Sequence, residues 1–149
     1  KNSKKRVKRM KKKIIIKKAY QTATQNIVKQ ILFDSLKKPE PVVTTTGTYV
    51  NTHSEFMGYA GIALQNTFYE LFNGKSFYDS LVNIISRGGD TDTNGCIAGA
   101  ILGAYYGVSE IPGDWIQVVN MTNPRSNTYP EIDQTKIGVL CKRMCDLIK

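Results

Sequence analysis

Apolar residues recur at three- and four-residue spacing along most of the chain, which is the pattern of amphipathic helices. The clearest stripe runs through residues 55–73, where five apolar side chains would share one helical face: Met57, Ala60, Leu64, Phe68 and Leu71. On this pattern we predict helices over residues 19–38, 55–73, 76–86, 96–106, 112–119 and 132–148.

Turn-forming and capping residues separate these segments. Asn73-Gly74 ends the second helix, and Ser76 with Asp79 three residues later has the spacing of a capping box at the start of the third. Gly88-Gly89 then breaks the third helix, and Gly107 ends the fourth. The helical pattern and the turn signals therefore agree on where the elements begin and end.

The stretch from Val42 to Val50 is rich in Thr and Val and does not follow helical spacing. It fits either a short strand or an ordered loop. Residues 123–130 have the composition of a second loop. Since the chain shows no internal repeat and no alternation over several strands, we predict one all-α domain.

Basic residues are concentrated at the N-terminus. Residues 1–18 hold 11 of the 21 Lys and Arg and no acidic residue, so residues 19–149 carry 10 basic and 12 acidic side chains. Blocks of like charge repel one another and are usually disordered. We expect residues 1–18 to be a disordered basic tail, which is either simply solvated or contacts nucleic acid, acidic lipid or a transport receptor.

Composition also argues against several classes of protein. The chain has no run of eighteen apolar residues, and Ile14–Ile16 is too short for a signal peptide, so we expect neither a membrane span nor secretion. An intracellular and by default cytoplasmic location follows, with the nucleus or a nucleic-acid-containing particle as alternatives raised by the tail. The odd set Cys96, Cys141 and Cys145 predicts reduced core thiols. Because the chain begins with Lys, we expect it to be a segment of a longer protein.

Oxygen-bearing side chains gather in the stretch SRGGDTDTNGC, directly before a predicted helix: Asp90, Asp92 and Thr93. One alternative is that Asp92 or Thr93 caps the helix. Capping needs only one of these residues, and it does not need the preceding Gly88-Gly89. Neighbouring carboxylates repel each other unless a cation lies between them, and Mg²⁺ or Ca²⁺ prefers oxygen ligands. We therefore predict a metal site.

Two further patterns in this region have simpler interpretations. The stretch matches the first half of an EF-hand loop, but the twelfth residue from Asp90 is Ile101, where that loop needs a bidentate Glu. The glycines at 95, 99 and 103 leave a bare stripe on the helix. Such a stripe predicts that a neighbouring helix or backbone packs closely against it.

The sequence RGGDTDTNGCIAGAILGAYYGVSEIPGDW resembles the second metal-binding motif of the ADP-ribosylglycohydrolase family, which includes the dinitrogenase reductase-activating glycohydrolase. The preceding HSEFMGYAGIALQNTFYELFNGKSFYDSLVNII is similar to the segment before that motif, so that the resemblance covers roughly residues 53–119. It implies a compact, orthogonal all-α fold and a Mg²⁺-dependent hydrolysis of the glycosidic bond between ADP-ribose and an acceptor.

The same resemblance implies roles for individual residues around two Mg²⁺ ions. Asp90, Asp92 and Thr93 would be metal ligands. Gly58 and Tyr59 match a Gly-Tyr pair along the ADP-ribose cleft, so Tyr59 is either a stacking partner of adenine or an ordinary half-buried aromatic residue. The substrate-binding candidates are Gly58, Tyr59, Gly89 and His53, the last with the alternative of a surface residue.

The resemblance also implies what this chain lacks. The family's other metal motifs lie in its N-terminal half and include a Thr-Asp-Asp triplet, whereas this chain contains no Asp-Asp pair. Three interpretations follow. The chain is the C-terminal portion of a hydrolase that acts on ADP-ribosylated protein and is completed by an N-terminal half or a partner chain. Alternatively, it is a non-catalytic remnant that binds ADP-ribose, a metal or a protein partner. In the third interpretation, its helical body serves as an assembly domain, and the basic tail contacts nucleic acid.

Overall fold

The computed structural model describes residues 2–121, 138–139, 142–144 and 146. The chain divides into two compact units, residues 1–111 and residues 112–149. In chain order, the first unit contains α1 (Asn2–Thr22), α2 (Asn26–Asp34), β1 (Val42–Val43), β2 (Tyr49–Val50), α3 (Ala60–Asn73), α4 (Phe77–Ser86), α5 (Thr91–Tyr106) and a 3₁₀ turn (Val108–Glu110). These helices, accompanied by one short hairpin, confirm the predicted all-α class.

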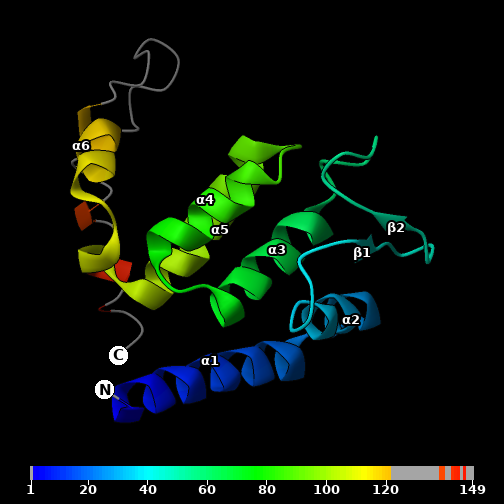
Figure 1. Cartoon of the computed structure of the whole chain (residues 1–149), viewed down its shortest axis with the longest axis horizontal. Helices are drawn as coiled ribbons and strands as arrows, with labels where there is room; N and C mark the ends of the chain where they lie inside the picture. Colours follow the sequence, from blue (N-terminus) through cyan, green and yellow to red (C-terminus); the bar gives the residue numbers. More distant parts are fainter. Residues whose placement is uncertain (1, 122–137, 140–141, 145, 147–149) are drawn as a thin grey trace. The chain divides into compact units, whose positions relative to one another are not determined.

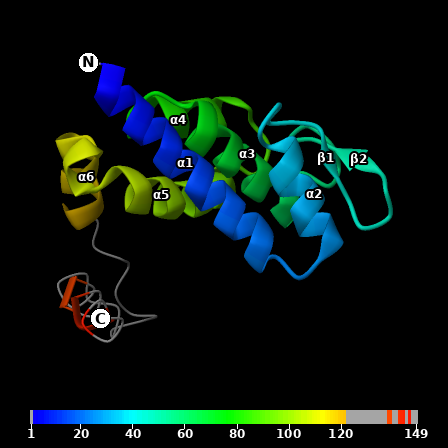
Figure 2. The same cartoon turned by 90° about the horizontal axis from the view of Figure 1, so that it is seen from below.

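Helix α3 lies at the centre of the first unit (Figure 1). Helices α4 and α5 pack on one side of it, and α1, α2 and β1 contact it on the other. In the view from below, α1 and α2 lie in front of this layer (Figure 2). Because α3 is buried over most of its surface, its polar side chains, among them Gln65, Asn66 and Glu70, must find partners inside the protein.

Within the stretch from residue 42 to residue 50, residues 42–43 and 49–50 form two short strands, and the residues between them form a turn. Strands β1 and β2 pair antiparallel with Val42 opposite Val50. Both side chains are buried in one hydrophobic cluster with Ile31 of α2 and Ile62 of α3. The hairpin thereby anchors the start of the segment 51–59, which leads into α3.

Most of the predicted boundaries are confirmed. Helix α3 ends at Asn73, and α4 begins after Ser76, whose Oγ accepts a hydrogen bond from the backbone N–H of Asp79 at 3.0 Å. Helix α5 ends at Gly107, which has a φ of +86°. Each of these ends depends on local hydrogen bonding or on glycine geometry, and such signals can be read from a few adjacent residues.

Three predicted helix starts were wrong: those of the helices over residues 19–38, 55–73 and 96–106, the last of which begins at Thr91. Helix α3 begins at Ala60 rather than at residue 55, because the preceding residues form turns in which the N–H of Met57 bonds to the carbonyl oxygen of Ser54. The predicted helix over residues 19–38 is divided, since Gln25 is extended and separates α1 from α2. Helical spacing of apolar residues continued across both breaks and concealed them.

Residues 2–22 form helix α1, where we expected a disordered tail over residues 1–18. Ile16 is buried against the rest of the unit, and Lys12 is only 6% exposed. The Lys12 Nζ donates hydrogen bonds to the carbonyl oxygens of Phe72 at 3.2 Å and Gly74 at 2.9 Å, at the C-terminal end of α3. Carbonyl groups at a helix C-terminus favour a cation, so these contacts oppose the repulsion within the basic run.

The glycine stripe of α5 is packed less tightly than expected. A Cβ atom on Gly95 would lie 3.6 Å from Cγ1 of Ile85, an ordinary van der Waals distance. A Cβ atom on Gly99 would have no neighbour within 4 Å among the residues that the structure describes. Cys96, which we expected in the core, is an exposed free thiol on the same helix; Cys141 and Cys145 lie outside the described residues.

The second unit contains α6 (Gly113–Met121), which begins directly after Pro112 as predicted. The predicted loop over residues 123–130 lies outside the described residues, as does most of the predicted helix over residues 132–148. Within the described part of the chain, no helix is both long enough and apolar enough to cross a membrane.

Candidate functional site

A sharp turn joins α4 to α5 and carries the predicted metal-binding residues. Gly88 and Gly89 have φ angles of +81° and +72°, which residues with side chains rarely adopt. Asp90 follows as the N-cap residue of α5, and its carbonyl oxygen accepts a hydrogen bond from the N–H of Asn94 at 3.0 Å. Its side chain makes no capping hydrogen bond. The capping alternative therefore does not account for the carboxyl group of Asp90.

The carboxyl groups of Asp90 and Asp92 lie close enough to interact at the start of α5. The pKa of Asp92 is lowered, chiefly by a side-chain hydrogen bond with Asp90 and then by the backbone N–H groups of Thr93 and of Asp92 itself. Asp92 and Thr93 are exposed, and Asp90 is half-buried. The structure thus brings the two predicted carboxyl groups together at the surface.

The segment between β2 and α3 lies against this turn. A Cβ atom on Gly89 would overlap the carbonyl oxygen of Thr52, and one on Gly88 would lie 3.1 Å from Cε1 of His53. Only glycine permits so close an approach of the two backbones. His53 is exposed, so its ring lies at the edge of the turn and not inside the core.

Gly58 also borders the turn, but its neighbour Tyr59 points elsewhere. A Cβ atom on Gly58 would lie 3.6 Å from Oδ2 of Asp90. The Tyr59 ring packs on the hydrophobic cluster below the hairpin, and its hydroxyl donates to the carbonyl oxygen of Val43 at 3.4 Å. The structure therefore gathers His53, Gly58 and Gly89 around the carboxyl pair, while Tyr59 is a half-buried aromatic residue.

Two residues beside the turn were missed by the sequence analysis. The hydroxyl of Thr52, a residue only 2% exposed, donates to the carbonyl oxygen of Arg87 at 2.9 Å. The backbone N–H of Thr52 donates to Oε2 of Glu40 at 3.4 Å. No spacing in the sequence connects Glu40 with Thr52, because the hairpin between them is what brings them together.

The side chains at the turn fit part of a site for a hard divalent cation. Two carboxyl groups and the Thr93 hydroxyl offer oxygen donors of the kind that Mg²⁺ binds, but an octahedral ion takes about six ligands. No group of three His, Cys, Asp or Glu side chains suited to a metal occurs among the described residues. The three oxygen donors at the turn are therefore fewer than one such ion takes.

Comparison with known proteins is consistent with this geometry. The ADP-ribosylglycohydrolase family model matches residues 4–148. An ADP-ribosyl glycohydrolase (L543) of Acanthamoeba polyphaga mimivirus is 37% identical over 79 residues, which are 52% of this chain and 24% of that protein. The ADP-ribosyl-[dinitrogen reductase] glycohydrolase of Rhodospirillum rubrum is 36% identical over 58 residues, or 39% of this chain and 20% of that protein.

The ADP-ribosylhydrolase ARH3 of Bos taurus is 55% identical over 42 residues, which are 28% of this chain and 12% of that protein. The chain thus spans a quarter or less of the length of these relatives. No solved structure gives a significant match. Since the family model covers nearly all of the sequence, the chain belongs to the ADP-ribosylglycohydrolase family.

Proposed function

We propose that this chain forms the C-terminal part of a Mg²⁺-dependent ADP-ribosylglycohydrolase site, which hydrolyses the glycosidic bond between ADP-ribose and an acceptor. The observation that supports this most strongly is the pairing of the Asp90 and Asp92 carboxyl groups, with the Asp90 carboxyl making no capping hydrogen bond. Two neighbouring carboxyl groups repel each other when both are ionised, and a divalent cation removes that repulsion.

Asp90, Asp92 and Thr93 would hold the metal. When bound, the ion supplies positive charge that orients ribose hydroxyls and lowers the pKa of a water molecule. Three donors are half of an octahedral set, so water, substrate, an N-terminal half or a partner chain would supply the remaining ligands for one ion and those for a second.

The other residues of the turn would shape the substrate side. Because Gly88 and Gly89 carry no side chain, Thr52 and His53 lie close against the turn, and the exposed His53 would border the substrate. Gly58 leaves the space beside the Asp90 carboxyl open, and the exposed ring of His53 borders it.

The decisive experiment is a glycohydrolase assay on the chain joined to, or mixed with, the N-terminal half of its longer protein. Release of ADP-ribose from an ADP-ribosylated protein is measured with Mg²⁺ and with a chelator. We expect Mg²⁺-dependent release that Asp90→Asn abolishes and that Asp34→Asn, a control on α2, retains. Binding of ADP-ribose without turnover would instead support the alternative of a non-catalytic binding module, and turnover in chelator would refute the metal-dependent proposal.

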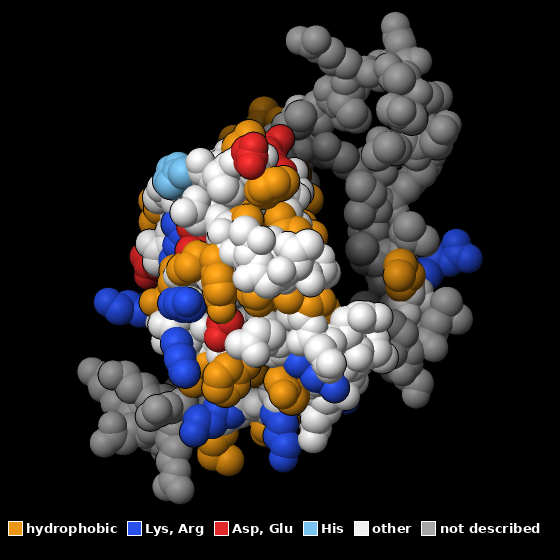
Figure 3. Space-filling view, turned by 90° about the vertical axis from the view of Figure 1, so that its right-hand side faces the viewer, with side chains coloured by type: hydrophobic (Ala, Val, Ile, Leu, Met, Phe, Trp, Pro, Cys, Tyr) orange, Lys and Arg blue, Asp and Glu red, His pale blue; other side chains and the backbone are white. Residues whose placement is uncertain are grey.

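The exposed lysines of α1 favour a second candidate function, which is contact with nucleic acid. In Figure 3, Lys and Arg side chains gather in the lower part of the face shown, where Figure 1 places α1 and α2. On α1 itself, Lys11, Lys13, Lys17 and Lys18 are all exposed. Affinity for DNA or RNA should fall steeply with salt and should be lost when these lysines are replaced by Gln; affinity independent of both would refute this function.

A further inference from the structure

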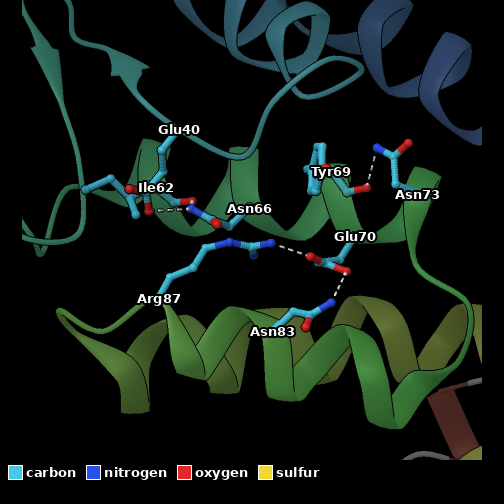
Figure 4. Close-up of polar contacts among 8 residues, drawn as sticks. All are labelled: Glu40, Ile62, Asn66, Tyr69, Glu70, Asn73, Asn83 and Arg87. Atoms are coloured by element: carbon cyan, nitrogen blue, oxygen red, sulfur yellow. Dashed lines mark hydrogen bonds and ion pairs between the residues drawn. The ribbon is translucent and has the colours of Figure 1, made fainter.

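Arg87 connects the turn that carries Asp90 to the centre of the fold. Its backbone ends α4, and its side chain reaches across to α3 (Figure 4). The guanidinium Nη2 pairs with Oε1 of Glu70, a residue only 2% exposed, and the guanidinium carbon lies 5.6 Å from the ring centroid of Tyr69. A buried carboxylate of α3 thus holds the residue that directly precedes Gly88.

Glu70 makes a second contact with α4. Its Oε2 accepts a hydrogen bond from Nδ2 of Asn83 at 3.3 Å, as Figure 4 shows. Asn83 and Arg87 are four residues apart and therefore neighbours on one helical face. Both carboxylate oxygens of Glu70 are consequently engaged by the last turn of α4.

The backbone of Arg87 is held from the other side. Its carbonyl oxygen accepts the hydrogen bond from Thr52, which is in turn bonded to Glu40. The second oxygen of Glu40, Oε1, accepts from Nδ2 of Asn66 at 3.3 Å. Since Asn66 and Glu70 are one turn apart on α3, contacts to a single face of α3 fix both the side chain and the backbone of Arg87.

A buried ion pair is an inefficient way to stabilise a fold, because desolvation offsets much of the attraction and apolar residues often serve as well. The ion pair does orient the Arg87 side chain, because a planar guanidinium binds a carboxylate in a defined geometry. This orientation matters here, because the two residues after Arg87 both have positive φ and lead straight into Asp90. The orientation of Arg87 therefore bears on the position of Asp90, three residues later.

We propose that Glu70 is a positioning residue: by holding Arg87, it fixes the turn that places the Asp90 carboxyl group beside that of Asp92. Glu70 acts from α3, and in this role it touches neither metal nor substrate. The importance of this for catalysis rests on the proposed function, whereas the fixing of the turn rests on the contacts alone.

The test uses the full chain and its isotope-labelled Glu70→Gln variant, which keeps the shape of the side chain and removes its charge. Amide hydrogen exchange of residues 88–92 is measured by NMR, and Mg²⁺ alone is titrated while the same amide signals are followed. We expect exchange of these amides to rise about tenfold in the variant, as for local opening of the turn, and the response to Mg²⁺ to weaken.

Thr67→Ala is the matched control, because Thr67 is buried on the same helix and its hydroxyl donates within α3, to the carbonyl oxygen of Ala63 at 2.7 Å. This variant should lower the melting temperature without altering residues 88–92. Unchanged exchange in Glu70→Gln, or an equal rise in the control, would overturn the proposal.

The Arg87→Met variant tests separately whether Glu70 acts through Arg87. If Glu70 acts through Arg87, the double variant Glu70→Gln/Arg87→Met should show no more exchange at residues 88–92 than Arg87→Met alone. Additive increases would contradict the proposed mechanism. A wild-type chain that ignores Mg²⁺ would count against the metal site of the proposed function, while the exchange measurements would still decide the role of Glu70.

Discussion

The carbonyl oxygen of Thr52 occupies the space that a side chain on Gly89 would need. We therefore predict that Gly89→Ala destabilises the chain by about 3 kcal/mol, since strain at a positive φ and overpacking each contribute about 1–3 kcal/mol. Urea unfolding measures this loss. Gly107→Ala is the control, because Gly107 has a φ of +86° but its Cβ would meet nothing within 4 Å in the described part of the chain.

The control should lose about 1–3 kcal/mol, the contribution of backbone strain alone, and so less than Gly89→Ala if overpacking adds to the strain. The difference between the two variants then reports the contact between Thr52 and Gly89. An equal loss of stability in both variants would mean that the segment 51–59 moves away from the added methyl group, so that its position against the turn is not rigid.

Elements that are defined by a few adjacent residues could be predicted from the sequence, whereas contacts between distant residues could not. The same holds for the candidate site. Gly88-Gly89 and the Ser76–Asp79 cap are each defined by a few adjacent residues, and both form as predicted. Lys12 was counted as part of a charged run, yet its contacts are with α3, some sixty residues away. Composition describes a segment by itself and cannot indicate which distant carbonyl groups it will meet.

The residues that contact the turn could not be predicted from the sequence, for a related reason. The Asp90–Asp92 spacing predicted a pair of neighbouring carboxyl groups, because both lie within one turn of a helix start. Glu40 and Glu70 were not predicted as part of the surroundings. One lies in a loop and the other on a helix face that looks polar by itself, and only the packing of α3 against α4 and the hairpin brings them to Arg87.

Removing Lys12 tests whether α1 belongs to the folded unit. We predict that Lys12→Ala destabilises the chain by about 2 kcal/mol, because hydrogen bonds from a charged group contribute about 1.5–3 kcal/mol. Lys11→Ala, at an exposed position of the same helix, should change stability by no more than about 0.5 kcal/mol. Thermal unfolding of the two variants makes the comparison, and a negligible effect of both would show that residues 1–18 behave as a free tail.

Magnesium should stabilise the chain through the carboxyl pair. A ligand present at 100 times its dissociation constant raises the free energy of unfolding by about 2.7 kcal/mol. We predict a rise of this kind on titration with Mg²⁺, absent in Asp92→Asn and retained in Asp34→Asn. Without Mg²⁺ the exposed Asp92 should be replaceable within about 0.5 kcal/mol. A rise that persists in Asp92→Asn would place the bound ion elsewhere.

Two helical glycines should respond to alanine in opposite directions. Alanine is more favourable than glycine in a helix interior by about 1 kcal/mol, and nothing described lies within 4 Å of a Cβ on Gly99. We therefore predict that Gly99→Ala stabilises the chain by about 0.5–1 kcal/mol. Gly61 lies in the first turn of α3, where a Cβ would lie 2.8 Å from Cζ of Tyr59 and 3.0 Å from Cδ1 of Ile31, so Gly61→Ala should destabilise the chain by about 1–3 kcal/mol.

Chemical denaturation of Gly99→Ala and Gly61→Ala under identical conditions measures the change in the free energy of unfolding of each variant. Stabilisation by both would mean that the Tyr59 ring moves aside readily, which would leave that ring free to turn toward a ligand. Destabilisation by both would mean that something packs on Gly99 in solution, as the sequence pattern of α5 first suggested. If Gly99→Ala stabilises the isolated chain but weakens its association with an N-terminal half, then the bare face of α5 is where that half binds, and the glycine stripe exists for that contact.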